Sequence, residues 1–270
     1  MDFNQKLLKI SKKNNSLLCV GLDIDKEKMP DFLFKNHTEP YLEFNKAIID
    51  STKDLVCAYK FNMAFYEIFG KMGLDLLEKT IKIIPNNIII ILDGKRNDIG
   101  NSSKKYAQFL YEKLNADATT VNPFMGHDSI LPFLEYENKC NFILCRTSNK
   151  SAVDFQDLKI SKVPLYQIVA KKIKEWNIRK NCGAVVGATY PEELKIIRGI
   201  LGENIPILIP GIGAQGGDIK KSIEFGTNSK KEMALVNSSR NIIFASKKHD
   251  FAEISRKNAL KLRDTINSNR

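Results

Sequence analysis

Charged residues follow an apolar run about a third of the way along this sequence of 270 residues. Residues 88–92 are Ile or Leu only, and Asp93, Lys95 and Asp98 come shortly after them. Such a short apolar run is typical of a strand buried on both faces, and active sites of α/β proteins are built at the carboxyl ends of these strands. Because side chains alternate along an extended chain, we expect Asp93 and Lys95 to point the same way. The spacing predicts an active site at the end of this strand, and a surface ion pair is the alternative.

A glycine-rich segment and an arginine near the C-terminus predict an anion-binding site. Residues 209–218 read Ile-Pro-Gly-Ile-Gly-Ala-Gln-Gly-Gly-Asp and contain the pattern G-x-G-x-x-G. A dinucleotide site is disfavoured because the segment follows the seventh predicted strand instead of the first, and the next strand ends in Asn237 instead of an acid. Glycines still let backbone N–H groups approach an anion, and the guanidinium of Arg240 suits bidentate phosphate binding. We therefore expect a phosphorylated ligand, with two ordinary turns as the alternative.

Apolar strand-like runs alternate with amphipathic helical segments along the whole chain. The helical segments include residues 106–114, 165–176 and 191–201, and a final helix is expected at 251–266. Eight strand-then-helix repeats in about 250 residues are typical of the (β/α)8 TIM barrel, an α/β fold. A doubly wound open sheet is the second choice, and we expect a single domain over residues 1–270 because no linker divides the chain. The predicted strands are residues 17–22, 56–61, 88–92, 118–122, 142–145, 183–186, 207–209 and 234–236.

The composition argues against several other classes of protein. The net charge of +11 is spread over helix faces without interleaved aromatic residues, so we expect solvated surface and not a nucleic-acid site. No apolar run is long enough to span a membrane, and the N-terminus lacks the apolar segment of a secretory signal. The five cysteines contain no C-x-x-C pair and the three histidines form no zinc motif. We therefore expect a cytoplasmic protein with reduced thiols and no structural metal.

Several motifs occur in the order found in one known family. The segment Asp93-Gly-Lys-Arg-Asn-Asp98 fits the D-x-K-x-x-D motif of the orotidine 5′-monophosphate decarboxylase superfamily. With the other motifs it resembles the orotidine 5′-monophosphate decarboxylase family, in the subgroup whose fifth strand ends in Thr-Ser-Asn. The resemblance runs from Asp23 to Arg240 and implies the stand-alone form, without a fused phosphoribosyltransferase. The other motifs are Val20-Gly-Leu-Asp23, Lys60-Phe-Asn-Met-Ala-Phe-Tyr66, Thr120-Val-Asn-Pro-Phe-Met-Gly126, Arg146-Thr-Ser-Asn149, Pro210-Gly-Ile-Gly-Ala-Gln-Gly-Gly217 and Val236-Asn-Ser-Ser-Arg240.

This resemblance implies a reaction and its catalytic residues. The expected reaction is the cofactor-independent decarboxylation of orotidine 5′-monophosphate to UMP and CO2, which ends pyrimidine biosynthesis. Asp93 and Lys95 would flank the pyrimidine C6, and Asp23 with Lys60 would hold the ribose hydroxyls. Asp98 would complete the site of a neighbouring subunit, so a homodimer is expected. The implied catalytic residues are Lys60, Asp93, Lys95 and Asp98.

The resemblance also implies the substrate-binding residues. Thr147 and Ser148 would read the edge of the pyrimidine, and Gln215 would lie on a loop that closes from phosphate to base. Ile99 and Ser102 would reach the neighbouring ribose together with Asp98. The residues expected at the phosphate end are Gly216, Gly217, Asn237 and Arg240.

Two alternative functions remain open from the sequence. A barrel with the same D-x-K-x-x-D motif could use Mg²⁺ on a sugar phosphate, as hexulose-phosphate synthase or ketogulonate-phosphate decarboxylase does. Asp23 and Asp93 could then supply metal oxygens, although Lys60 in the same site disfavours a divalent ion. A basic barrel that binds RNA without catalysis is the second alternative, and it predicts RNA affinity that falls with salt.

Overall fold

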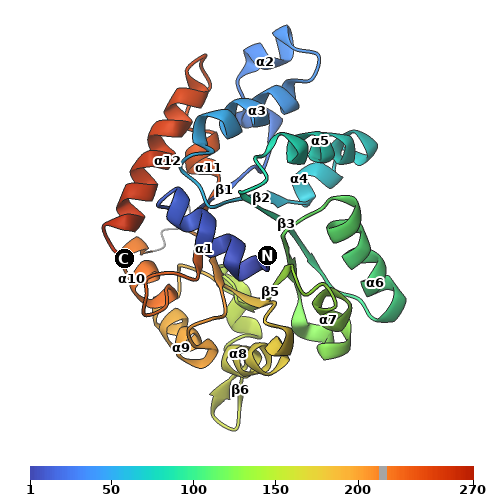
Figure 1. Cartoon of the computed structure of the whole chain (residues 1–270), viewed down its shortest axis with the longest axis vertical. Coiled ribbons are helices and arrows are strands. Elements are labelled where there is room, and N and C mark those ends of the chain that lie inside the picture. The colour runs from blue at the N-terminus through green and yellow to red at the C-terminus, as the bar shows by residue number, and fades with distance from the viewer. Residues whose placement is uncertain (213–217) are drawn as a thin grey trace.

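The protein folds as a closed barrel of eight parallel strands surrounded by helices (Figure 1). The structure is a computed structural model that describes residues 1–212 and 218–270. The order around the barrel is β1-β10-β9-β8-β5-β4-β3-β2, and Leu18 on the first strand pairs with Val236 on the last. The predicted (β/α)8 fold is confirmed, and the open sheet is wrong because these two strands close the ring. The strands are β1 (Leu18–Gly21), β2 (Ala58–Asn62), β3 (Ile89–Arg96), β4 (Ala118–Val121), β5 (Cys140–Arg146), β8 (Cys182–Val186), β9 (Ile207–Ile209) and β10 (Ala234–Ser238).

The helices pack around this barrel and close one of its ends. The predicted helices at 165–176 and 191–201 are confirmed with the same bounds, and the last helix runs one residue further than expected. The segment predicted as a helix over 106–114 is the end of α6 followed by a π-helical turn, Phe109–Lys113. The helices are α1 (Phe3–Lys13), α2 (Asp31–Asn36), α3 (Pro40–Thr52), α4 (Ala64–Glu67), α5 (Gly70–Ile83), α6 (Gly100–Gln108), α7 (His127–Leu134), α8 (Leu165–Trp176), α9 (Pro191–Leu201), α10 (Ile219–Gly226), α11 (Arg240–Ile243) and α12 (Phe251–Asn267), with short helices η1 (Lys26–Lys28), η3 (Pro123–Met125), η4 (Lys150–Asp154) and η5 (Asn177–Arg179).

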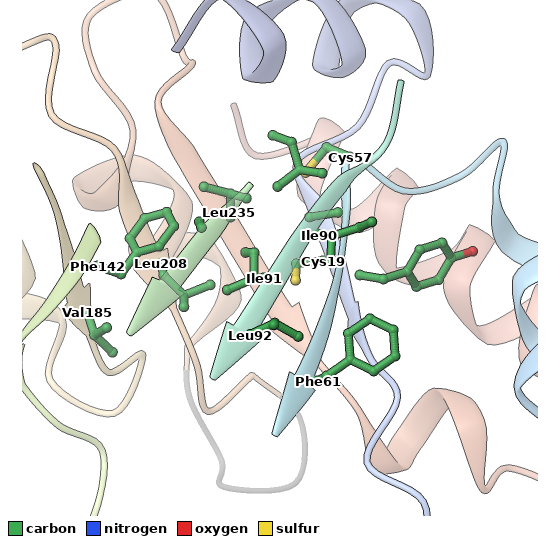
Figure 2. Packing of buried hydrophobic residues seen from close by; sticks show 14 of the residues in the cluster. Cys19, Cys57, Phe61, Ile90, Ile91, Leu92, Phe142, Val185, Leu208 and Leu235 are labelled. Carbon is green, nitrogen blue, oxygen red and sulfur yellow. The ribbon is translucent and has the colours of Figure 1, made fainter. Parts of the chain in front are cut away.

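The barrel interior is filled by apolar side chains from the strands. Figure 2 shows Ile91, Leu208 and Leu235 gathered in the core, and each is nearly or completely buried. At the amino-terminal ends of the strands, α1 lies across the barrel (Figure 1) and Lys6 Nζ is 2.7 Å from both carboxylate oxygens of Asp117. Because α1 covers this end, the cavity expected for a ligand lies at the other end, at the carboxyl ends of the strands.

A buried arginine on α9 connects, through hydrogen bonds, the segments that lead into β9 and β10. The guanidinium of Arg198 donates to the carbonyl oxygens of Gly202, Ile205, Gly226 and Met233, at 2.6–3.1 Å. The arginine is only 8% exposed, so it supplies hydrogen bonds to carbonyl groups inside the protein.

Two further expectations concern the thiols and the membrane. All five cysteines are buried and none forms a disulfide, as expected. In the described part of the chain, every helix is too short or too polar to cross a bilayer. A short antiparallel pair, β6 (Lys159–Ile160) with β7 (Val163–Pro164), lies between η4 and α8 and was not predicted.

Candidate active site

The carboxyl ends of the strands surround a cavity of about 670 Å³. The structure brings together at this cavity most of the residues predicted from the sequence. Gln215, Gly216 and Gly217 lie outside the described residues. Asp98, Ile99 and Ser102 do not line the cavity. The predicted residues that do line it are Asp23, Lys60, Asp93, Lys95, Thr147, Ser148, Asn237 and Arg240.

Four charged groups form a row of alternating sign on one wall of the cavity. Lys60 Nζ is 3.8 Å from Asp23 Oδ1 and 3.2 Å from Asp93 Oδ2. Lys95 Nζ is 2.7 Å from Asp93 Oδ1. Lys60 is 4% exposed, whereas the side chain of Lys95 is 47% exposed. Within the row, Lys60 is therefore an internal counter-charge, and Lys95 is the cation that a ligand can reach.

Neighbouring strands bring these residues into register. Gly21 pairs with Lys60 across β1 and β2, and Asn62 pairs with Asp93 across β2 and β3. The backbone N–H of Asn62 donates to Asp23 Oδ1 at 3.2 Å, which fixes the carboxylate beyond the end of β1. Gly21 leaves room for this arrangement, since a Cβ at that position would lie 1.9 Å from Ser239 Oγ.

Lys95 reaches Asp93 through a local irregularity of β3. The predicted strand ended at residue 92, but β3 continues to Arg96 with a register shift between Leu92 and Arg96, and Lys95 has a φ of 49°. Its N–H donates to Thr120 Oγ1 at 2.9 Å, and that hydroxyl donates to Asp93 Oδ1 at 2.8 Å. The prediction that Asp93 and Lys95 lie on the same side is correct. Regular side-chain alternation along the strand does not extend to Lys95. The two side chains lie on the same side because Lys95 has a left-handed backbone conformation, which the hydrogen bond to Thr120 holds.

The row keeps its charges by mutual stabilisation. Burial opposes ionisation of Asp93, but the ammonium groups of Lys60 and Lys95 hold the pKa of this carboxyl well below its usual range. Burial likewise opposes protonation of Lys60, and the carboxylates of Asp23 and Asp93 raise the pKa of Lys60 above its usual value. Both groups are therefore charged throughout the physiological range.

The neighbouring side of the cavity, at the ends of β9 and β10, carries the residues expected to bind phosphate. Arg240 begins α11 directly after β10, and its side chain makes no hydrogen bond to the residues that the structure describes. Gly211, with a φ of 97°, adopts at the end of β9 a conformation that glycine tolerates. Asn237 Oδ1 is buried without a partner among the described residues. These groups leave a donor and an acceptor available to an anionic ligand.

Asp98, Ile99 and Ser102 lie on the outside of the barrel. Asp98 and Ser102 line a separate surface hollow of about 600 Å³, together with Arg96 and Tyr106. Arg96 forms an ion pair with Glu67, and its guanidinium lies 5.2 Å from the ring centroid of Tyr106. Within one chain, Lys95 therefore has Asp93 but not Asp98 beside it.

Sequence reasoning missed several residues that line the cavity. Asn62, Thr120 and Asn149 stand inside recognised motifs, so a signal for them was present. Gln156 stands in a stretch without strand or helix periodicity, which gave no signal. The missed polar residues are Asp25, Lys28, Asn62, Thr120, Asn149, Ser151, Gln156, Ser238, Ser239 and Asn241.

The fold and this site together define a TIM-barrel enzyme that places a reactive lysine and an arginine around one cavity. Residues 16–253 match the model of the "Orotidine 5'-phosphate decarboxylase / HUMPS family". The chain belongs to this family.

Named relatives and solved structures agree with this assignment. A protein of Dehalococcoides mccartyi named orotidine 5′-phosphate decarboxylase is 47% identical over 99% of this chain and 98% of its own length. The structure of Leishmania donovani OMP decarboxylase is similar with a TM-score of 0.86 and 36% identity, over 99% of this chain and 98% of that one. A putative orotidine-monophosphate-decarboxylase of Toxoplasma gondii has a TM-score of 0.88 at 33% identity, with 99% of both chains covered.

Proposed function

We propose that this chain catalyses the cofactor-independent decarboxylation of orotidine 5′-monophosphate to UMP and CO2. The observation that carries the proposal is the alternating row Asp23–Lys60–Asp93–Lys95, with Lys95 open to a cavity that also holds Arg240. The relatives that match nearly the whole chain carry this activity in their names. The pyrimidine pathway role follows from the activity, with residues 1–270 acting as one catalytic domain.

The chemistry requires stabilisation of a carbanion. Loss of CO2 from C6 leaves negative charge that no neighbouring carbonyl delocalises well, so the protein must supply electrostatic stabilisation. The ammonium of Lys95 supplies it and then gives its proton to C6. Asp93 beside the substrate carboxylate would repel it by about 4 kcal/mol at 4 Å, which is roughly three decades of rate.

The contacts of Asp93 make that repulsion smaller. One oxygen accepts from Lys95 at 2.7 Å and from Thr120 at 2.8 Å, and the other faces Lys60 at 3.2 Å. Three donors thus compensate the charge of this carboxylate before substrate arrives. Carbanion stabilisation by Lys95, and phosphate binding by Arg240 with Gln215, Gly216 and Gly217, therefore supply most of the acceleration.

The position of Lys60 argues against the magnesium-dependent alternative. A divalent ion shared by Asp23 and Asp93 would occupy the space between their carboxylates. The ammonium of Lys60 already lies there, within 3.8 Å of both. A metal ion at this place would face a buried like charge, so we propose a reaction without one.

The same proposal includes a twofold dimer in which Asp98 acts in the partner's site. Asp98 and Ser102 are directed away from their own cavity, and apolar side chains nearby are unusually exposed, including Ile68 at 77%, Ile99 at 52% and Phe124 at 79%. An isologous interface over this face would bury them and make both sites equivalent. The unpaired thiols support a cytosolic location for this enzyme.

The activity is tested by following loss of the absorbance of orotidine 5′-monophosphate while UMP forms. Turnover that persists in EDTA is expected, and absence of turnover would refute the proposal. The dimer is tested by unfolding Lys95→Ala and Asp98→Ala together and refolding them, which should restore one intact site in each mixed dimer. A mixture of Lys95→Ala and Asp93→Asn is the matched control, since each lesion stays in the site of its own chain, so both sites of the mixed dimer are damaged and no intact site can form. If the first mixture gains no more activity than the control, Asp98 does not act in trans.

A further inference from the structure

A glutamine on the cavity wall is held in one orientation by its neighbours. Gln156 Oε1 accepts from the backbone N–H of Thr147 at 2.8 Å and from Arg146 Nη1 at 3.4 Å. Gln156 Nε2 donates to Thr147 Oγ1 at 2.8 Å. Because two donors face the oxygen, a flipped amide would place N–H groups against N–H groups. The side chain therefore keeps its NH2 group on a fixed side, and Gln156 lines the cavity.

Arg146 is the anchor of this arrangement. It ends β5 and is fully buried, with Nη2 3.1 Å from Asp157 Oδ2 and its guanidinium 3.7 Å from the ring centroid of Tyr190. Burial of a cation lowers the stability of the folded protein unless the cation is paired and hydrogen-bonded. The end of β5 and the segment after it must therefore keep these contacts with Arg146. Arg146 thereby ties residues 147–157 to the wall formed by β5 and β8.

The hydroxyl of Thr147 is used within this network. Thr147 Oγ1 donates its hydrogen to Asn149 Oδ1 at 2.7 Å and accepts from Gln156. Thr147 was expected to read the pyrimidine edge, but its only side-chain donor is already engaged. The second hydrogen of Gln156 Nε2 has no acceptor among the described residues. On this wall, Gln156 therefore offers a side-chain amide donor whose orientation is fixed at both its oxygen and its nitrogen.

The position of this donor matches one part of the proposed substrate. In the strand order, β5 lies directly across the barrel from β1, whose end leads to Asp23. A nucleotide whose ribose lies at Asp23 and Lys60 directs the farthest atom of its base, the 4-carbonyl oxygen, towards β5. A neutral amide suits this neutral carbonyl, whereas the cationic Arg240 suits the phosphate. The two ends of the ligand thus meet groups of matching charge.

We propose that Gln156 is a specificity-determining residue that donates a hydrogen bond to the 4-carbonyl of the pyrimidine, with Arg146 as the positioning residue that keeps it a donor. This inference rests on the proposed decarboxylase function. It assigns to the enzyme a preference for a base with an acceptor at position 4 over a base with a donor there. UMP carries an oxygen at this position, and CMP carries an amino group.

The test compares the dissociation constants of UMP and CMP for the whole protein. Gln156→Glu keeps the acceptor that faces Thr147 and Arg146 but removes the donor. We expect it to weaken UMP binding by about 2- to 10-fold, as the loss of one neutral hydrogen bond does, and to leave CMP binding unchanged or tighter. Gln167→Glu is the matched control, since Gln167 is also half-buried but does not line the cavity. It should leave the ratio of the two constants unchanged.

Arg146 is tested through its dependence on Gln156. Arg146→Lys should lower the preference for UMP in the wild-type background but not in Gln156→Ala, because there is no amide left to orient. Urea unfolding checks that each variant is folded. Should both Gln156 variants keep the wild-type ratio while the wild type still decarboxylates orotidine 5′-monophosphate, the assignment of Gln156 is wrong and the proposed function stands. A wild type without decarboxylase activity would instead overturn the function on which the inference rests.

Discussion

Replacement of Lys60 by methionine tests the electrostatic account of the site. The substitution keeps most of the length of the side chain and removes its charge. Two carboxylates, Asp23 and Asp93, then face each other across an apolar group, since Lys60 lies 3.8 Å from one and 3.2 Å from the other. Breaking a buried ion pair by removal of one partner costs about 3–5 kcal/mol, because the remaining charge is left uncompensated. We expect Lys60→Met to lower the free energy of unfolding by that amount.

The pH dependence of this loss follows from the direction of the pKa shifts. The pKa of Asp93 is lowered in the folded protein, so its contribution to stability is present above its unfolded value of about 3.9 and is lost as the pH falls through the folded value. The pKa of Lys60 is raised, so its contribution persists until the pH passes above about 10.4. The difference between wild type and Lys60→Met should therefore be constant from about pH 5 to 9 and shrink below about pH 4.

Urea unfolding at several pH values measures this difference. Lys53→Met is the matched control, because Lys53 pairs with Asp50 at 2.9 Å on the surface, where both side chains are about half exposed. Such an exposed pair contributes about 0–1 kcal/mol. Addition of Asp93→Asn to Lys60→Met should recover part of the stability. A loss at Lys60 as small as that at Lys53, or no recovery in the double variant, would refute the account of Lys60 as a buried counter-charge.

Three further predictions concern the chemistry and the scaffold. Lys95→Ala should lower kcat by far more than tenfold while UMP still binds, and a variant that keeps a tenth of wild-type kcat would exclude Lys95 as the proton donor. Arg240→Ala should lower kcat/KM for the nucleotide by at least about 100-fold, with little effect on phosphate-free orotidine, and equal losses for both substrates would contradict phosphate binding by Arg240. Arg198→Met should lower the free energy of unfolding in urea by at least about 3 kcal/mol, because buried carbonyl groups lose their donor. Lys195→Met, on the exposed face of the same helix, should lower it by less than about 0.5 kcal/mol.

The strands and most of the site could be predicted because their signals are local. A continuous apolar run marks a strand buried on both faces, and the charged residue after it marks the end that faces the cavity. Asp93 and Arg240 were found in this way, whereas Asp23 and Lys60 were expected from the family resemblance. The closure of the barrel followed from the number of strand–helix repeats.

The remaining features depend on partners far away in the sequence. The left-handed Lys95 is held by Thr120 on the next strand, and the burial of Arg146 depends on Tyr190 and on an irregular segment after β5. The π-helical turn at Phe109–Lys113 replaces part of a predicted α-helix. No periodicity in the chain encodes these arrangements, because each is decided by packing between elements that are not neighbours in sequence.

The pairing of β1 with β10 has a consequence for the order in which the protein acquires activity during synthesis. Leu18 cannot find Val236 until nearly the whole chain has left the ribosome. Until then the growing sheet has two open edges, and such edges pair readily with other chains. Asp23 follows β1 and Arg240 follows β10. The two ends of the nucleotide site therefore lie on either side of the strand pair that forms last. A nascent chain therefore has no complete nucleotide site. Ligand binding stabilises only those molecules in which the barrel has closed.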